Sequence, residues 1–151
     1  MRIGLVVALW LIPAAAPAQF ENLPKVLQDA VEQQKKECGE KVDFKPDFVA
    51  TKDINGDGIV DYILNYESAA CGDFAPFWCG TGGCHTQVFA SLPKGGYFKA
   101  LDMQVRQIEF RTVRKRPTIV LDLHGGQCGK HGPEPCPRTL VWNGKTFKRV
   151  K

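Results

Sequence analysis

An even set of six cysteines lies in this 151-residue sequence: Cys38, Cys71, Cys79, Cys84, Cys128 and Cys136. In an exported protein such a set is expected to form disulfides, whereas in a reducing compartment it more often binds metal or serves catalysis. Six cysteines allow 15 pairings. The short spacings favour Cys79 with Cys84 and Cys128 with Cys136 as local loops, which leaves Cys38 to reach Cys71.

The first 18 residues predict that the chain is exported. Met1-Arg2 is a short basic start, Ile3 to Ile12 is an apolar run, and 16–18 has the small-x-small form of a cleavage site. This order is typical of a secretory signal peptide. The apolar run is shorter than the roughly 20 residues that a membrane-spanning helix needs. We therefore expect a signal peptide at 1–18 and a single secreted or periplasmic domain at 19–151, without a membrane span.

The hydrophobic periodicity predicts an α+β fold. From Asn22 to Glu37 apolar residues recur every three or four positions, with Asn22 as the N-cap and Pro24 in the first turn. Short segments rich in β-branched and aromatic residues follow, at 48–50, 60–66, 87–92, 97–103, 104–113, 118–123 and 139–142. Asn143-Gly144 is a strong hairpin signal. We expect one N-terminal helix packed on an antiparallel β-sheet of about five to seven strands, braced by disulfides.

The segment from Asp53 to Asp61 has the residue pattern of a calcium loop. Oxygen-bearing side chains recur at its positions 1, 3, 5 and 9, and glycines stand at positions 4 and 6. Hard cations such as calcium take six to eight oxygen ligands, and a glycine permits the sharp bend that a short loop needs. The predicted ligands are the side chains of Asp53, Asn55, Asp57 and Asp61 and the backbone carbonyl of Ile59. The alternative is an Asx-rich turn that holds no metal, because Asn-Gly and Asp-Gly form turns by themselves.

This loop resembles the calcium loops of EF-hands, dockerins and the FG-GAP/VCBS-type repeats of secreted proteins, over nine residues only. It departs from the EF-hand at position 12, where Leu64 stands in place of the bidentate Glu. The following Val60 to Tyr66 predicts a strand rather than a helix, so the FG-GAP-like form is the closer match. The resemblance implies a structural calcium site, and the missing carboxylate implies a dissociation constant of about 10⁻⁴ to 10⁻³ M.

The segment between Cys71 and Cys84 carries a second candidate site. Phe74, Phe77 and Trp78 fall inside it, and aromatic side chains on a tethered loop can anchor a partner or stack on a sugar ring. The alternative is that the loop folds these aromatics into a small core of its own.

Other chemistries have weaker support in the sequence. Cys79, Cys84 and His85 contain elements of a haem-attachment motif, and together with His124, Cys128, His131 and Cys136 they contain elements of a zinc site. The usual spacing of two residues between cysteines is missing for both. The sequence contains no nucleophile elbow, His-Glu-x-x-His or P-loop. His124, beside Gly125-Gly126, is the one histidine with the surroundings of an acid, a base or a ligand.

Charge is divided unevenly along the chain. Residues 21–100 carry 8 Lys/Arg and 12 Asp/Glu, whereas residues 101–151 carry 11 and 4. A basic half can meet anionic partners, but Arg114-Lys115-Arg116 is the longest basic run, so we expect no specific nucleic-acid binding. We expect an exported, non-catalytic, calcium-stabilised binding module whose partner is a protein or a polysaccharide. The alternatives are a small secreted metal-assisted hydrolase, and a protein inhibitor that uses the Cys71 to Cys84 loop.

Overall fold

The computed structural model describes residues 20–74 and 76–150, so the predicted signal peptide lies outside the described residues. The described chain has one α-helix, two short 3₁₀ helices and eleven strands. The helices are α1 (Lys25–Cys38), η1 (Tyr66–Ser68) and η2 (Gly125–Cys128). The strands are β1 (Val42–Phe44), β2 (Val49–Lys52), β3 (Asp61–Asn65), β4 (Ala69–Cys71), β5 (Cys79–Gly80), β6 (Gly83–Ser91), β7 (Tyr97–Val105), β8 (Gln107–Val113), β9 (Arg116–Leu123), β10 (Cys136–Trp142) and β11 (Phe147–Arg149).

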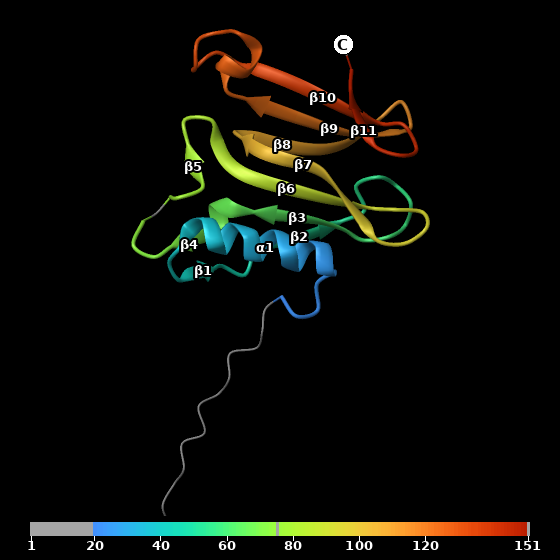
Figure 1. Cartoon of the computed structure of the whole chain (residues 1–151). Helices are drawn as coiled ribbons and strands as arrows, with labels where there is room; N and C mark the ends of the chain where they lie inside the picture. The colour runs from blue at the N-terminus through green and yellow to red at the C-terminus, as the bar shows by residue number, and fades with distance from the viewer. Residues whose placement is uncertain (1–19, 75, 151) are drawn as a thin grey trace, which may run out of the picture.

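The strands form three antiparallel sheets that stack in layers (Figure 1). A five-stranded sheet, in which β2, β3, β6 and β5 follow one another and β7 pairs with β6, lies in the middle. The helix α1 and the β1–β4 ribbon cover one of its faces, and the sheet β8-β9-β10-β11 lies against the other. The predicted helix and antiparallel strands are confirmed. The single sheet that we expected is instead divided, because periodicity shows which face of a strand is buried but not which sheet the strand joins.

The helix α1 begins two residues later than the sequence analysis predicted. Pro24, rather than Asn22, is the N-cap, with an extended ψ of 142° and no side-chain cap bond. Proline fits here because a helix does not need the N–H groups of its first turn. Gly39 ends the helix in the left-handed conformation, and its N–H donates to the Lys35 carbonyl. The buried stripe of α1 comprises Leu27, Ala30, Val31 and Gln34.

Two hydrophobic cores lie on the two faces of the middle sheet. The first packs Leu27 and Val31 of α1 against Phe48, Leu64 and other buried residues. The second packs residues of β6 and β7 against Ile119, Leu121 and Leu123 of β9. Because side chains alternate along a strand, β3 can serve both cores: Leu64 enters the first, and Ile63 packs against the second.

Three disulfides brace these layers, with the pairing that the spacing predicted. Cys38–Cys71 joins the end of α1 to β4, Cys79–Cys84 closes the β5–β6 turn, and Cys128–Cys136 closes the loop before β10. All six cysteines are therefore bonded to one another, which removes the thiolates that the haem and zinc interpretations required. Three disulfides are typical of proteins that fold in an oxidising compartment.

The strands β7 and β8 follow each other with only Arg106 between them, so the chain passes here from the middle sheet to the outer sheet (Figure 1). Close packing at this corner requires glycine in the opposite strand. A Cβ atom on Gly83 would lie 1.9 Å from the Val105 carbonyl oxygen, and the φ of Gly83 is +93°.

The structure also contains β1, β4 and β5, which the sequence analysis missed because each has only two or three residues. No helix among the described residues is long and apolar enough to cross a membrane.

Candidate functional site

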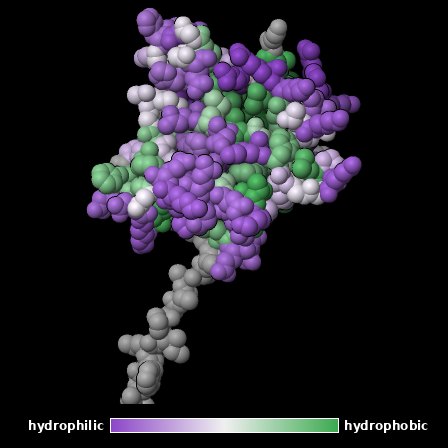
Figure 2. Space-filling view, viewed as in Figure 1, coloured by the Kyte–Doolittle hydropathy of each residue, from purple (hydrophilic) through white to green (hydrophobic). Residues whose placement is uncertain are grey.

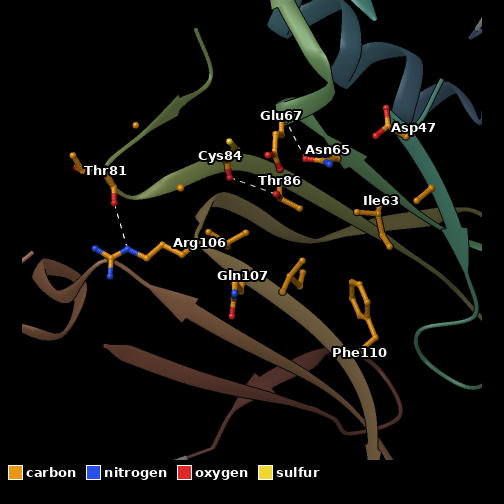
Figure 3. Close-up of a pocket in the computed structure, with 15 residues that line it drawn as sticks. Asp47, Ile63, Asn65, Glu67, Thr81, Cys84, Thr86, Arg106, Gln107 and Phe110 are labelled. Carbon is orange, nitrogen blue, oxygen red and sulfur yellow. Dashed lines mark hydrogen bonds between the residues drawn. The ribbon is translucent and has the colours of Figure 1, made fainter. Parts of the chain in front are cut away.

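A large cavity lies between the middle sheet and β8 (Figure 3). It has a volume of about 580 Å³. The middle sheet contributes Ala50, Ile63, Asn65 and Thr86, and β8 contributes Gln107, Ile108 and Phe110. The sequence analysis did not predict this cavity, since the cavity depends on how two sheets stack.

A second cavity of about 190 Å³ continues along β8. Phe110 lines both cavities, and Arg111 and Thr112 follow it in the second. The opposite wall of the second cavity includes Asp53 and Gly56 of the predicted calcium loop. We refer to the two cavities together as the β8 groove, which runs beside β8 from Arg106 to Thr112.

One end of the β8 groove is held by Arg106. Its Nε donates to the Thr81 carbonyl at 3.3 Å, and its Nη1 donates to the Pro133 carbonyl at 3.4 Å. Its Nη2 donates to the carbonyl of Gly132. The guanidinium group therefore joins the β5–β6 turn, the β7–β8 corner and the 129–135 loop, and three of its five donors are already used.

The other charges that line the larger cavity are negative. Asp47 comes from the turn before β2, and Glu67 comes from η1. Both residues are exposed, and neither forms an ion pair with another of the described residues. The larger cavity thus combines an apolar wall, a row of neutral polar groups and two carboxylates without an ion-pair partner.

The predicted calcium loop is folded by its own hydrogen bonds. The Asp53 carboxylate accepts N–H bonds from Gly56 at 2.7 Å, Asp57 at 3.2 Å and Gly58 at 2.9 Å. The Asp57 carboxylate accepts the Ile59 N–H at 2.8 Å. In the described residues no three His, Cys, Asp or Glu side chains gather closely enough to hold a metal ion.

Asp61, the predicted ligand at position 9, is fully buried. One of its oxygens accepts the N–H groups of Ile54 at 2.6 Å and Asn55 at 3.2 Å, and the other accepts the N–H of Ser91 at 2.7 Å. Asp61 therefore fastens both ends of the loop to the end of β6. Sequence reasoning missed Ser91, because a serine at the end of a strand carries no signal of its own.

Ser91 also helps to lower the pKa of the Asp57 carboxyl. Its hydroxyl donates to Oδ2 of Asp57 at 2.7 Å, and the Asn55 amide donates to the same oxygen at 3.2 Å. Burial by itself raises the pKa of the Asp57 carboxyl, but the bonds from Ser91, Ile59 and Asn55 outweigh it and hold that pKa below its ordinary value.

The predicted aromatic loop is divided between the core and the surface. Trp78 is buried, and its indole N–H donates to Oε1 of Gln34 in α1 at 2.8 Å. Phe74 is 71% exposed and Phe77 is 45% exposed. Hydrophobic side chains accordingly gather at the tip of this loop, at the left edge of Figure 2, whereas the outer face of α1 is hydrophilic.

A polar network lies between β6 and β7. Nε2 of His85 lies 3.0 Å from Oδ1 of Asp102. The Asp102 carboxylate also accepts a hydrogen bond from Nε2 of Gln87 at 3.2 Å and forms an ion pair with Lys99. Burial lowers the pKa of His85 although the Asp102 charge acts in the opposite direction. Burial raises the pKa of the Asp102 carboxyl, but Lys99 and Gln87 outweigh it, and the net shift is downward.

His124 caps the short helix η2. Its Nδ1 accepts the Gly126 N–H at 3.2 Å, which makes it the N-cap of η2. Neither His124 nor His85 lines the β8 groove.

No protein-family model, curated protein or solved structure matches this chain.

Proposed function

We propose that this chain is an exported, non-catalytic binding domain that holds its partner in the β8 groove. The observation that carries the proposal is the groove itself, a long depression with an apolar wall and polar groups along it. Binding sites are commonly concave, largely apolar and furnished with a few polar groups that fix orientation. The rigid, disulfide-braced sheets on both sides would keep such a site formed in the absence of the partner.

Filling the groove tests this proposal. Ala50 lies on the face of β2 that lines the larger cavity, and Thr51 lies on the opposite face of the same strand. The variant Ala50→Trp would therefore fill the groove, and Thr51→Trp is its matched control. Displayed libraries of random linear and disulfide-cyclised peptides, and a panel of soluble polysaccharides, would be selected on the parent.

The expected ligands bind the parent and Thr51→Trp but lose at least about tenfold in affinity with Ala50→Trp, which corresponds to roughly one well-packed side chain. Ligands that bind all three proteins equally would overturn the groove as the site. Chemical conversion of a bound ligand would overturn the non-catalytic assignment and favour the hydrolase alternative.

We further propose that calcium binds the Asp53 to Asp61 loop and stiffens the end of the groove that this loop forms. The supporting observations are the oxygen-rich donor set and the exposure of Asp53 and Asp57, whose carboxylates would exchange backbone N–H groups for the ion. Asn55, Ile59 and Asp61 complete the expected set. Binding that occurs only in the native state stabilises it by roughly 2.7 kcal/mol when the free ion is 100 times the dissociation constant.

Thermal unfolding of the mature, oxidised protein in EDTA and in a millimolar calcium series tests this second part. The midpoint should rise with calcium in the parent and in the control Asp43→Ala, an exposed carboxylate of β1 outside the loop. It should not rise in Asp57→Ala. Equal behaviour of the parent and Asp57→Ala would leave an Asx-rich turn without metal.

The inhibitor alternative rests on the exposure of Phe74 and Phe77. If these side chains insert into a partner, replacing both with serine would abolish binding while leaving the unfolding midpoint unchanged. A partner held in the β8 groove would instead bind this double variant as it binds the parent.

A further inference from the structure

We infer that the occupant of the β8 groove is an extended polypeptide segment, which adds as a strand to the free edge of β8 and places a cationic side chain beside Asp47 and Glu67. This inference rests on the proposed function, since it names the class of partner for the same site.

The first support is the free edge of β8. Among the residues that the structure describes, β8 pairs only with β9 and β2 pairs only with β3. Ala50 and Lys52 of β2 and five residues of β8 line the groove, so two strand edges border one depression. An edge strand offers unpaired N–H and C=O groups, which is the basis of recognition by strand addition.

The edge of β8 also lacks the usual protection against pairing. Natural edge strands are blunted by proline, bulges, short length or charges that point inward. β8 has seven residues, no proline and a regular register with β9. Its side chains facing the larger cavity include Ile108 and Phe110. Arg111, which lines the smaller cavity, forms an ion pair with Glu109 of the same strand. A strand of this length spans about 23 Å and would accept a segment of about seven residues.

The second support is the surface that an added strand would lie on. Ile63 of β3 and Phe110 of β8 lie on opposite sides of the larger cavity (Figure 3). Alternate side chains of the occupant would pack on this apolar strip while their neighbours face solvent. Sugar recognition relies on aromatic faces, and Phe110 is the one aromatic residue among those lining the two cavities, so a polypeptide fits better than a polysaccharide.

The third support is charge. Arg106 is already bound by three carbonyl groups, whereas the Asp47 and Glu67 carboxylates have no cationic partner among the described side chains. The free charge of the larger cavity is therefore negative, and an occupant with Lys or Arg would complement it.

The test uses synthetic peptides of about seven residues, the length of β8. They alternate Val and Thr and carry a single Lys, Glu or Ser at each position in turn. A second set carries N-methyl groups on alternate amides, which removes the N–H donors along one edge. Fluorescence polarisation would measure binding to the parent, Glu67→Gln and Asp47→Asn. Glu109→Gln, a carboxylate on the opposite face of β8, is the control.

The best Lys peptides should bind at least about tenfold more tightly than the matching Glu peptides. Methylation of the edge-facing amides should weaken binding by about tenfold. Glu67→Gln and Asp47→Asn should each weaken it by about two- to fivefold, and Glu109→Gln should leave it unchanged. Upon binding, backbone amides between Gln107 and Thr112 should gain protection against hydrogen exchange.

Equal binding of methylated and unmethylated peptides, or a preference for Glu peptides, would overturn the inference. So would groove-dependent ligands that are all polysaccharides or cyclised peptides, although the proposed function would then stand. Ligands that ignore Ala50→Trp would remove the proposed function as well.

Discussion

Replacing Asp61 tests whether one buried carboxylate holds the 53–61 loop to the sheet. Its two oxygens accept three backbone N–H groups, and the side chain is fully buried. A hydrogen bond to a charged group contributes about 1.5–3 kcal/mol, and each buried donor left unsatisfied costs about 1–3 kcal/mol. These terms do not add fully, because water can enter the vacated site. We therefore expect Asp61→Ala to lower the free energy of unfolding by about 4 kcal/mol, a large share of a normal domain stability.

Asp53 provides a matched control within the same loop. Its carboxylate also accepts three N–H groups, but the residue is exposed and water can replace it. Asp53→Ala should therefore cost only about 1 kcal/mol. Urea unfolding of both variants at neutral pH in EDTA, followed by fluorescence and circular dichroism, measures the difference without any contribution from calcium. Equal costs for the two variants would refute the argument from burial.

Three further predictions concern the framework. Replacing Cys38 and Cys71 together with serine should lower the free energy of unfolding by about 4 kcal/mol in the chain-entropy account, because their disulfide closes a loop over a separation of 33 residues; urea unfolding would check this. Gly83→Ala should prevent stable folding, since a methyl group there would overlap the backbone of the neighbouring strand; circular dichroism of the expressed variant would show it, and native unfolding would contradict it. The lowered pKa of His85 means that the unfolded chain takes up a proton first as the pH falls below about 6.5. Stability should thus decrease between neutral pH and about pH 5.5. Urea midpoints of His85→Asn should show a flatter dependence on pH. Asp102, with its lowered pKa, changes the stability only as the pH falls below about 4.

Local rules predicted the local parts of this fold. The helix follows from its apolar stripe, and the β10–β11 hairpin forms around Asn143-Gly144 as the turn chemistry indicates. The disulfide pairing follows from spacing because two of the three bridges close short loops, with separations of 5 and 8 residues. These features depend on residues that are neighbours in the sequence.

The β8 groove depends on residues that are far apart in the sequence. It arises because the chain changes sheets at Arg106, so that β8 lies over Ile63 of β3 without a further strand beside it. The pattern of β8 alone predicts a strand but not that one edge is free. In the same way, Asp61 could be identified as an oxygen donor from the sequence, but its bond to the Ser91 N–H required the fold.

The hydrogen bonds of Arg106 make the groove depend on whether the Cys128–Cys136 disulfide is oxidised or reduced. Two of the three carbonyl partners of Arg106 belong to Gly132 and Pro133, and the Cys128–Cys136 disulfide closes the loop that carries them. Reduction of this bridge would release the loop, free a guanidinium group that lines the same cavity as the Asp47 and Glu67 carboxylates, and loosen the corner at which the two sheets meet. A reductant would thereby change both the width and the charge of the groove, although neither cysteine of the pair lines it.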